Sequence, residues 1–82
     1  MERNNLLGER VFELRKRAGL TQKALGDAVG LSYKAISTIE GGSRGTTVDK
    51  VIELAYYFHV STDYLLGITD DPAWRGDPRD GQ

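Results

Sequence analysis

At 82 residues, the chain is long enough for one small domain and too short for a second hydrophobic core. Its 39% hydrophobic and 28% charged residues are ordinary for a folded soluble protein and argue against general disorder. There is no cysteine, which excludes a disulfide framework and thiolate metal ligands. No apolar run approaches the roughly 18 residues of a membrane helix, and the N-terminus lacks the apolar core of a signal peptide. We therefore expect a cytoplasmic protein with no membrane contact.

The net charge of −1 is unevenly distributed along the chain. Residues 1–67 carry nine Lys or Arg and eight Asp or Glu, whereas residues 68–82 carry two and four. Six basic residues lie between the end of the first predicted helix and the loop after the third: Arg15, Lys16, Arg17, Lys23, Lys34 and Arg44. Taken alone, this clustering is more typical of an ordinary solvated surface, with a binding face for an anionic partner as the alternative.

The first helix is predicted from about residue 7 to residue 18, because Leu7 and Val11 begin a set of apolar residues at helical spacing. Asn5 is the expected N-cap, and Gly19 is expected to take the left-handed conformation that ends many helices. Gly8 is expected to weaken the first turns of this helix.

Two short helices joined by a tight turn are predicted next, over residues 22–29 and about 33–40. Each has a hydroxyl N-cap, Thr21 for the first and Ser32 for the second. Gly30 stands at the corner, where a positive φ is expected. Gly26 lies inside the first of these helices, and we expect another helix to cross within contact distance there, where only a small residue fits.

The second of these helices has two different faces. Ile36 and Ile39 share the inward face by 3.6-residue arithmetic. The opposite face combines an aromatic residue, a cation, two hydroxyls and a glycine, which are Tyr33, Lys34, Ser37, Thr38 and Gly41. Because a merely solvated face carries charges of both signs and this one has no acid, we expect it to be a contact surface.

A fourth helix is predicted to start after a Thr46 or Thr47 cap. Its broad apolar face predicts the main core helix and consists of Val48, Val51, Ile52, Leu54, Ala55 and Phe58. Ser61 is expected to cap a short fifth helix. Residues 68–82 contain two prolines and four aspartates and are predicted to form an acidic tail. Trp74 is expected to anchor this tail either on the domain or on a partner.

These residues together resemble the Cro/C1-type helix-turn-helix domain of phage repressors and bacterial XRE-like regulators. The resemblance covers about residues 7–67, including the stretch LRKRAGLTQKALGDAVGLSYKAISTIEGG. The positions that match the family pattern are Gln22, Leu25, Gly26, Val29, Gly30, Leu31, Ile36, Ile39 and Glu40. Two departures are Ala24, where an acidic residue is frequent, and the loop SRGTT, which lacks the proline common before the fourth helix.

The resemblance implies an all-α, compact five-helix bundle of the lambda-repressor-like type over residues 1–67, with the third helix in the DNA major groove. Its DNA-binding residues would be Gln22, Lys23, Ser32, Tyr33, Lys34, Ser37, Thr38 and Arg44. Gln22 would face a phosphate, Lys34 would donate to guanine, and Thr38 would touch a thymine methyl. The resemblance also implies a buried ion pair between Arg15 and Glu40.

In this family the fifth helix and the residues after it form the dimer contact, which implies Tyr64, Leu65, Leu66 and Ile68. The expected function is a dimeric transcriptional repressor on a palindromic operator. An antitoxin that binds a toxin protein through the tail is the alternative, and a protein-interaction module without DNA binding is a third. With one histidine, no cysteine and no phosphate-binding loop, we expect neither enzymatic activity nor a metal or cofactor.

Overall fold

The computed structural model describes residues 6–42 and 46–74, and these residues form five α-helices and no strand. The helices are α1 (Leu7–Arg17), α2 (Gln22–Val29), α3 (Tyr33–Gly41), α4 (Val48–Phe58) and α5 (Thr62–Leu66). The predicted all-α, five-helix architecture is therefore confirmed. None of these helices has the length and apolar character needed to cross a membrane.

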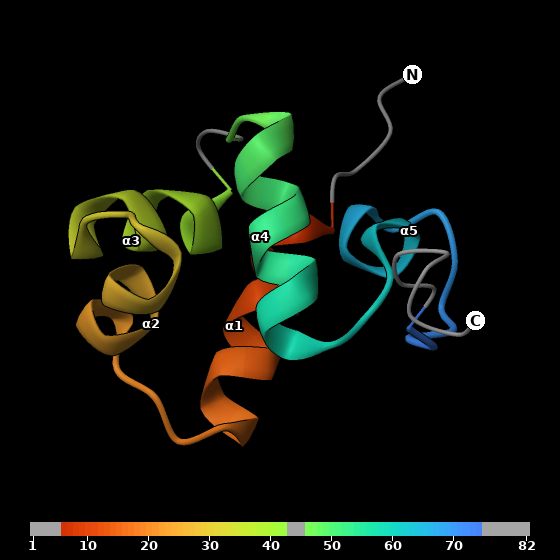
Figure 1. The fold of residues 1–82 in the computed structure, drawn as a ribbon, viewed down its shortest axis with the longest axis horizontal. Coiled ribbons are helices and arrows are strands. Elements are labelled where there is room, and N and C mark those ends of the chain that lie inside the picture. Colours follow the sequence, from red (N-terminus) through yellow and green to blue (C-terminus); the bar gives the residue numbers. More distant parts are fainter. Residues whose placement is uncertain (1–5, 43–45, 75–82) are drawn as a thin grey trace.

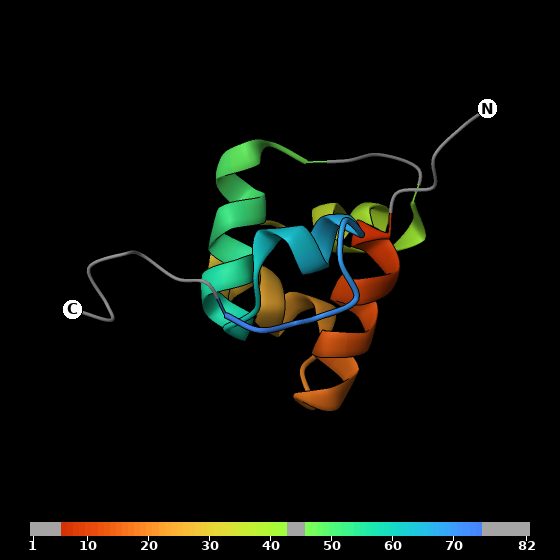
Figure 2. The same cartoon turned by 90° about the vertical axis from the view of Figure 1, so that its right-hand side faces the viewer.

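The five helices share one hydrophobic core. In Figure 1, α4 stands in the centre, with α2 and α3 on one side and α5 on the other. Helix α1 packs on α3 and α5, and α2 packs on α3 and α4; Figure 2 gives the view turned by 90°. The buried apolar residues are Leu7, Val11, Leu25, Val29, Ile36, Ile39, Val51, Leu54, Ala55, Val60 and Leu65. Every helix contributes to this set, so none of them can bury its apolar face without the others.

Hydroxyl side chains cap the start of four helices, because the first backbone amides of a helix have no intrahelical partner. The Thr21 hydroxyl accepts from the amide of Ala24 at 3.0 Å, and the Ser32 hydroxyl from that of Ala35 at 3.1 Å. The Thr47 hydroxyl accepts from the amide of Lys50 at 3.2 Å, and the Ser61 hydroxyl from that of Tyr64 at 3.0 Å. Thr47, and not Thr46, is thus the cap of α4. Helix α1 follows Leu6, which makes no side-chain cap hydrogen bond; Asn5 lies outside the described residues.

Two buried glycines mark places where backbones approach closely. At Gly8, α1 crosses the end of α3, and a Cβ atom would collide with the carbonyl oxygen of Ile39 and lie 3.0 Å from that of Glu40. At Gly26, a Cβ atom would collide with the carbonyl oxygen of Leu31. The close neighbour at Gly26 is therefore the turn of the motif itself, and the expected crossing helix is wrong at this position.

Residues 68–74, hereafter the docked segment, pack against the domain and do not form a free tail. Arg10 of α1 donates from Nη1 to the carbonyl oxygens of Tyr64 (2.7 Å) and Thr69 (2.8 Å). Its Nη2 donates to Asp70 Oδ1 at 2.8 Å, and its guanidinium lies 4.0 Å from the centre of the Tyr64 ring. The first part of the predicted tail therefore contacts α1 through Arg10.

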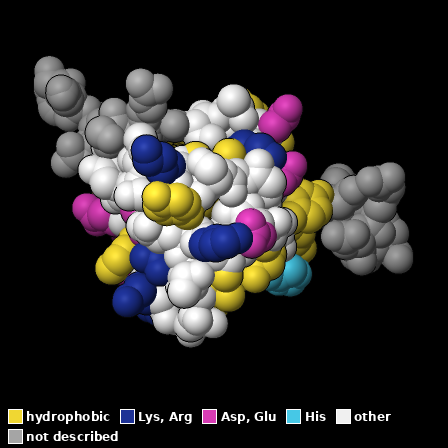
Figure 3. Space-filling model, turned by 90° about the vertical axis from the view of Figure 1, so that its left-hand side faces the viewer, with side chains coloured by type: hydrophobic (Ala, Val, Ile, Leu, Met, Phe, Trp, Pro, Cys, Tyr) yellow, Lys and Arg dark blue, Asp and Glu magenta, His cyan; other side chains and the backbone are white. Residues whose placement is uncertain are grey.

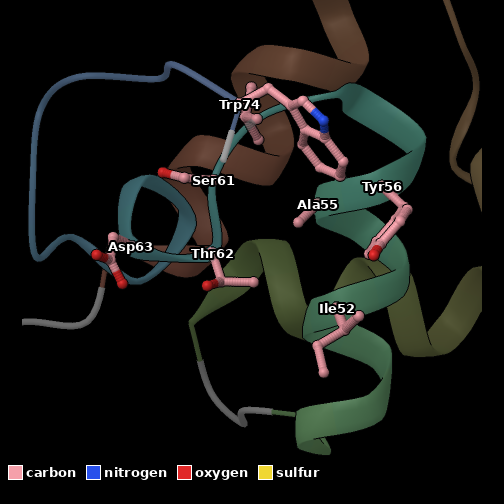
Figure 4. A pocket seen from close by; sticks show the side chains of 8 residues that line it. Ile52, Ala55, Tyr56, Ser61, Thr62, Asp63 and Trp74 are labelled. Atoms are coloured by element: carbon pink, nitrogen blue, oxygen red, sulfur yellow. The ribbon is translucent and has the colours of Figure 1, made fainter. Parts of the chain in front are cut away.

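Trp74 anchors the far end of the docked segment on α4. Its ring meets Tyr56 edge-on at 4.8 Å between centroids and stacks on His59 at 4.5 Å. Figure 4 shows the indole above Ala55 and Tyr56, at one side of a groove of about 360 Å³. Of the two alternatives for Trp74, the structure shows anchoring on the domain. Residues 75–82 lie outside the described residues.

We predict that Gly8→Ala lowers the free energy of unfolding by about 1–3 kcal/mol, the usual cost of overpacking, because the added methyl meets rigid backbone. Gly41→Ala is the matched control, since Gly41 is helical and a Cβ there has no neighbour within 4 Å. It should stabilise by about 0.4–1 kcal/mol through the unfolded chain. Urea unfolding of both variants checks the pair, and a Gly8→Ala variant as stable as the wild type would contradict the close crossing.

Candidate nucleic-acid interface

A buried ion pair joins α1 to the end of α3, as the family resemblance implied. Arg15 donates from Nε to Glu40 Oε2 at 2.6 Å and from Nη2 to Oε1 at 3.0 Å, a bidentate geometry. The two side chains are only 10% and 5% exposed, and Arg15 Nη1 also donates to the carbonyl oxygen of Leu20 at 2.8 Å. Both charges are therefore compensated by partners inside the protein.

The hydrogen bond to Glu40 raises the pKa of Arg15; desolvation lowers it, and the charge of Glu40 raises it further. A group with a raised folded-state pKa contributes stability that is present below its unfolded pKa and lost as the pH rises through its folded pKa. For an arginine this loss falls above the pH range in which proteins are handled. The titration of Arg15 therefore makes no contribution to the pH dependence of stability near neutrality.

Gln22, the first residue of α2, joins the same junction. Its Nε2 donates to Glu40 Oε1 at 3.2 Å, so one carboxylate holds side chains from α1 and α2. The sequence placed Gln22 against a phosphate, and the structure adds this intramolecular role. An amide nitrogen carries two hydrogens, so the bond to Glu40 leaves one for an external acceptor.

The turn of the motif has the geometry that the sequence predicted. Gly30 has a φ of 75°, and the amide of Leu31 donates back to the carbonyl oxygen of Gly26 at 2.8 Å. The Ser32 hydroxyl caps α3 by accepting a hydrogen bond from the amide of Ala35. Any contact of Ser32 with a ligand would have to leave this cap in place. The turn directs α3 away from α2 with its predicted contact face outward.

The outward face of α3 presents the predicted side chains to solvent. Tyr33 is 56% exposed, Lys34 and Ser37 are exposed, and Thr38 is partly buried. Thr38 donates from Oγ1 to the carbonyl oxygen of Lys34 at 2.9 Å. Because its hydroxyl hydrogen is engaged within the helix, Thr38 offers a ligand its methyl group and oxygen lone pairs.

Lys23 and Arg44 are the two remaining basic residues that were predicted to contact DNA. Lys23 is exposed and pairs with Asp27 at 3.1 Å, a surface pair that an anionic ligand can replace at little cost. Arg44 lies outside the described residues. Figure 3 shows the side of the molecule on which α2 and α3 lie, with Lys and Arg side chains at several points of the surface.

The four predicted dimer residues do not share one environment. Leu65 is fully buried in the core and Tyr64 is partly buried beside Arg10, whereas Leu66 and Ile68 are 38% and 71% exposed. Leu65 therefore serves the domain's own core and offers no surface to a second copy.

Helix α4 supplies exposed apolar residues that the sequence assigned to its inner face. Val48 is 73% exposed and Ile52 is 41% exposed. They line a groove of about 320 Å³ together with Thr46, Val51, Thr62 and Leu66. The apolar surface near α5 is thus shared with α4, which the sequence analysis missed because these residues fit the apolar pattern of the helix.

A helix, a tight glycine turn and a second helix with an exposed outer face, carried by a five-helix scaffold, define a helix-turn-helix domain. The chain belongs to the Cro/C1-type helix-turn-helix family of DNA-binding transcription regulators; the family model, described as Helix-turn-helix, matches residues 11–65.

Curated relatives support this assignment. The chain is 38% identical over 64 residues to YobD, an uncharacterized HTH-type transcriptional regulator of Bacillus subtilis, and the match covers 78% of this chain and 57% of YobD. It is 35% identical over 71 residues to the HTH-type regulator y4dJ of Sinorhizobium fredii, covering 87% of this chain and 92% of y4dJ. The chain spans about half the length of YobD and of the B. subtilis regulator ImmR, of which it covers 48%.

A solved structure of a DNA complex is also similar. The P22 c2 repressor protein in complex with a synthetic operator superimposes with a TM-score of 0.71 at 38% sequence identity. This match covers 74% of the present chain and 92% of the repressor chain.

Proposed function

We propose that this domain binds a specific duplex DNA sequence by placing α3 in the major groove, and that it represses transcription by occupying an operator. The observation that carries the proposal is the exposed face of α3, which combines Tyr33, Lys34, Ser37 and Thr38 and which the Arg15–Glu40 pair holds against the scaffold. The major groove admits one helix and distinguishes all four base pairs. The similarity to a repressor solved on operator DNA supports this arrangement.

Each exposed side chain has a chemistry that suits one part of the duplex. The Lys34 ammonium suits guanine O6 and N7, and the Thr38 methyl suits the thymine methyl. Tyr33 suits a sugar or phosphate beside the bases. Gln22 and Lys23, at the start of α2, suit the phosphate backbone, where free helix amides also favour an anion. Backbone contacts fix the register, and the α3 side chains supply the specificity.

We predict that Thr38→Ser weakens binding by about 1 kcal/mol at one base-pair position, because it removes the methyl group and keeps the hydroxyl. Thr38→Val keeps the methyl and should retain the preference at that position. Duplexes selected from a random pool by the wild-type protein provide the site, and its single-base variants are titrated with each protein. Equal weakening by Thr38→Ser on every duplex would remove Thr38 from base recognition.

The proposal includes a homodimer on a palindromic site. A single α3 offers few base contacts, and two copies on half-sites about 10 base pairs apart double them. The surface proposed for the second copy is the exposed apolar one along the α4–α5 groove, formed by Val48, Ile52 and Leu66. A contiguous apolar patch on a small soluble domain marks a contact site.

Val48→Glu tests this surface, because Val48 is 73% exposed and a carboxylate in the first turn of α4 favours the helix dipole. We expect a folded variant that is monomeric in sedimentation equilibrium and no longer prefers paired half-sites. Tyr57→Glu is the control, since Tyr57 is 45% exposed on α4 and lies outside the patch. An unchanged association state of Val48→Glu would rule this surface out.

We do not propose an antitoxin role. That alternative assigned partner binding to an aromatic tail, and the aromatic residue, Trp74, is engaged by Tyr56 and His59 of its own domain.

A further inference from the structure

Lys50, in the first turn of α4, caps the end of a different helix. Its Nζ donates to the carbonyl oxygen of Val29, the last residue of α2, at 2.9 Å. The last carbonyls of a helix lack intrahelical partners and form the negative end of its dipole, so a cation is favourable there. The Lys50 side chain is 25% exposed and also lies 3.6 Å from Glu53 Oε1. The turn at Gly30 binds the carbonyl of Gly26, and the carbonyl of Val29 is bound from the central helix.

The same ammonium lies at the corner of the motif. A Cβ atom at Gly30 would be 3.0 Å from Lys50 Nζ, so the lysine packs directly beside the left-handed residue of the turn. The two residues that follow Gly30 lead into α3. The hydrogen bond therefore attaches the start of α3, through the turn, to the helix at the centre of the domain.

Lys50 and the Arg15–Glu40 pair hold opposite ends of α3. Glu40 stands near the C-terminal end of α3 and is bound by α1. The N-terminal end has Ser32 as its cap and the Val29 carbonyl, three residues earlier, bound by α4. Fixing both ends fixes the direction in which the α3 side chains point.

We propose that Lys50 is a positioning residue for base recognition, which sets the orientation of α3 without touching DNA. The inference rests on the proposed function of α3. Without the Lys50 ammonium, the Val29 carbonyl must find water and the turn gains freedom, so the contacts of α3 with bases lose their fixed geometry. Contacts with phosphates, which tolerate small displacements, persist.

The test compares Lys50→Met with Lys50→Arg and Glu53→Gln. Methionine keeps a long apolar stem without a donor, arginine keeps a cationic donor, and Glu53→Gln neutralises the neighbouring carboxylate of Lys50 while leaving the bond to Val29. Affinity is measured against salt for a duplex selected by the wild type and for a scrambled duplex of equal length. We expect Lys50→Met to lose about tenfold in preference for the selected duplex, the effect of one charged hydrogen bond. Affinity for the scrambled duplex and the salt slope stay unchanged, and both control variants behave as wild type.

Two results would overturn the inference. If Lys50→Met weakens both duplexes alike and lowers the salt slope by about one, Lys50 contacts a phosphate. If its preference is unchanged while its stability falls, the bond serves folding alone. Amide exchange at Leu31 in the free protein, faster in Lys50→Met than in Lys50→Arg, gives a second measure of the turn that is independent of DNA. A wild type that prefers no duplex would instead refute the proposed function.

Discussion

The ion pair between Arg15 and Glu40 holds the end of α3 against α1, and its carboxylate also binds α2. Arg15 belongs to α1 and Glu40 to α3. Gln22 of α2 donates to Glu40 Oε1, the same oxygen that accepts from Arg15 Nη2. A buried pair adds little net stability compared with apolar residues of the same size, because both charges lose their water. The pair nevertheless permits few relative placements of its two side chains, because a bidentate guanidinium and carboxylate must face each other in one plane. We therefore regard the pair as a device for orientation.

The rest of the scaffold holds the same helix from other sides. The close crossing at Gly8 brings the backbone of α1 against the last turn of α3. The tight turn at Gly30 sets the start of α3, and Lys50 ties that turn to α4. The outer face of α3 remains exposed and takes no part in the core, as its proposed docking in a DNA groove requires.

Local patterns made much of this fold predictable from the sequence. The hydroxyl caps at Thr21, Ser32 and Ser61 and the turn at Gly30 are each determined by a few neighbouring residues, and the structure has them where the sequence placed them. The Arg15–Glu40 pair spans 25 positions and came from family resemblance. The Arg10 contacts with the docked segment span 54 to 60 positions and have no local pattern, so the sequence analysis missed them. Likewise, periodicity cannot tell which apolar residues of α4 face the core and which face solvent.

The most direct test of this account is the double replacement Arg15→Met with Glu40→Leu, which removes both charges and keeps comparable apolar volume. Such replacements leave stability similar or higher, so the variant should fold. The measurement is its affinity, relative to wild type, for a duplex that the wild-type protein selected from a random pool. We predict a stable domain that has lost much of its preference for that duplex. A stable variant with unchanged affinity and preference would show that the pair does not orient α3.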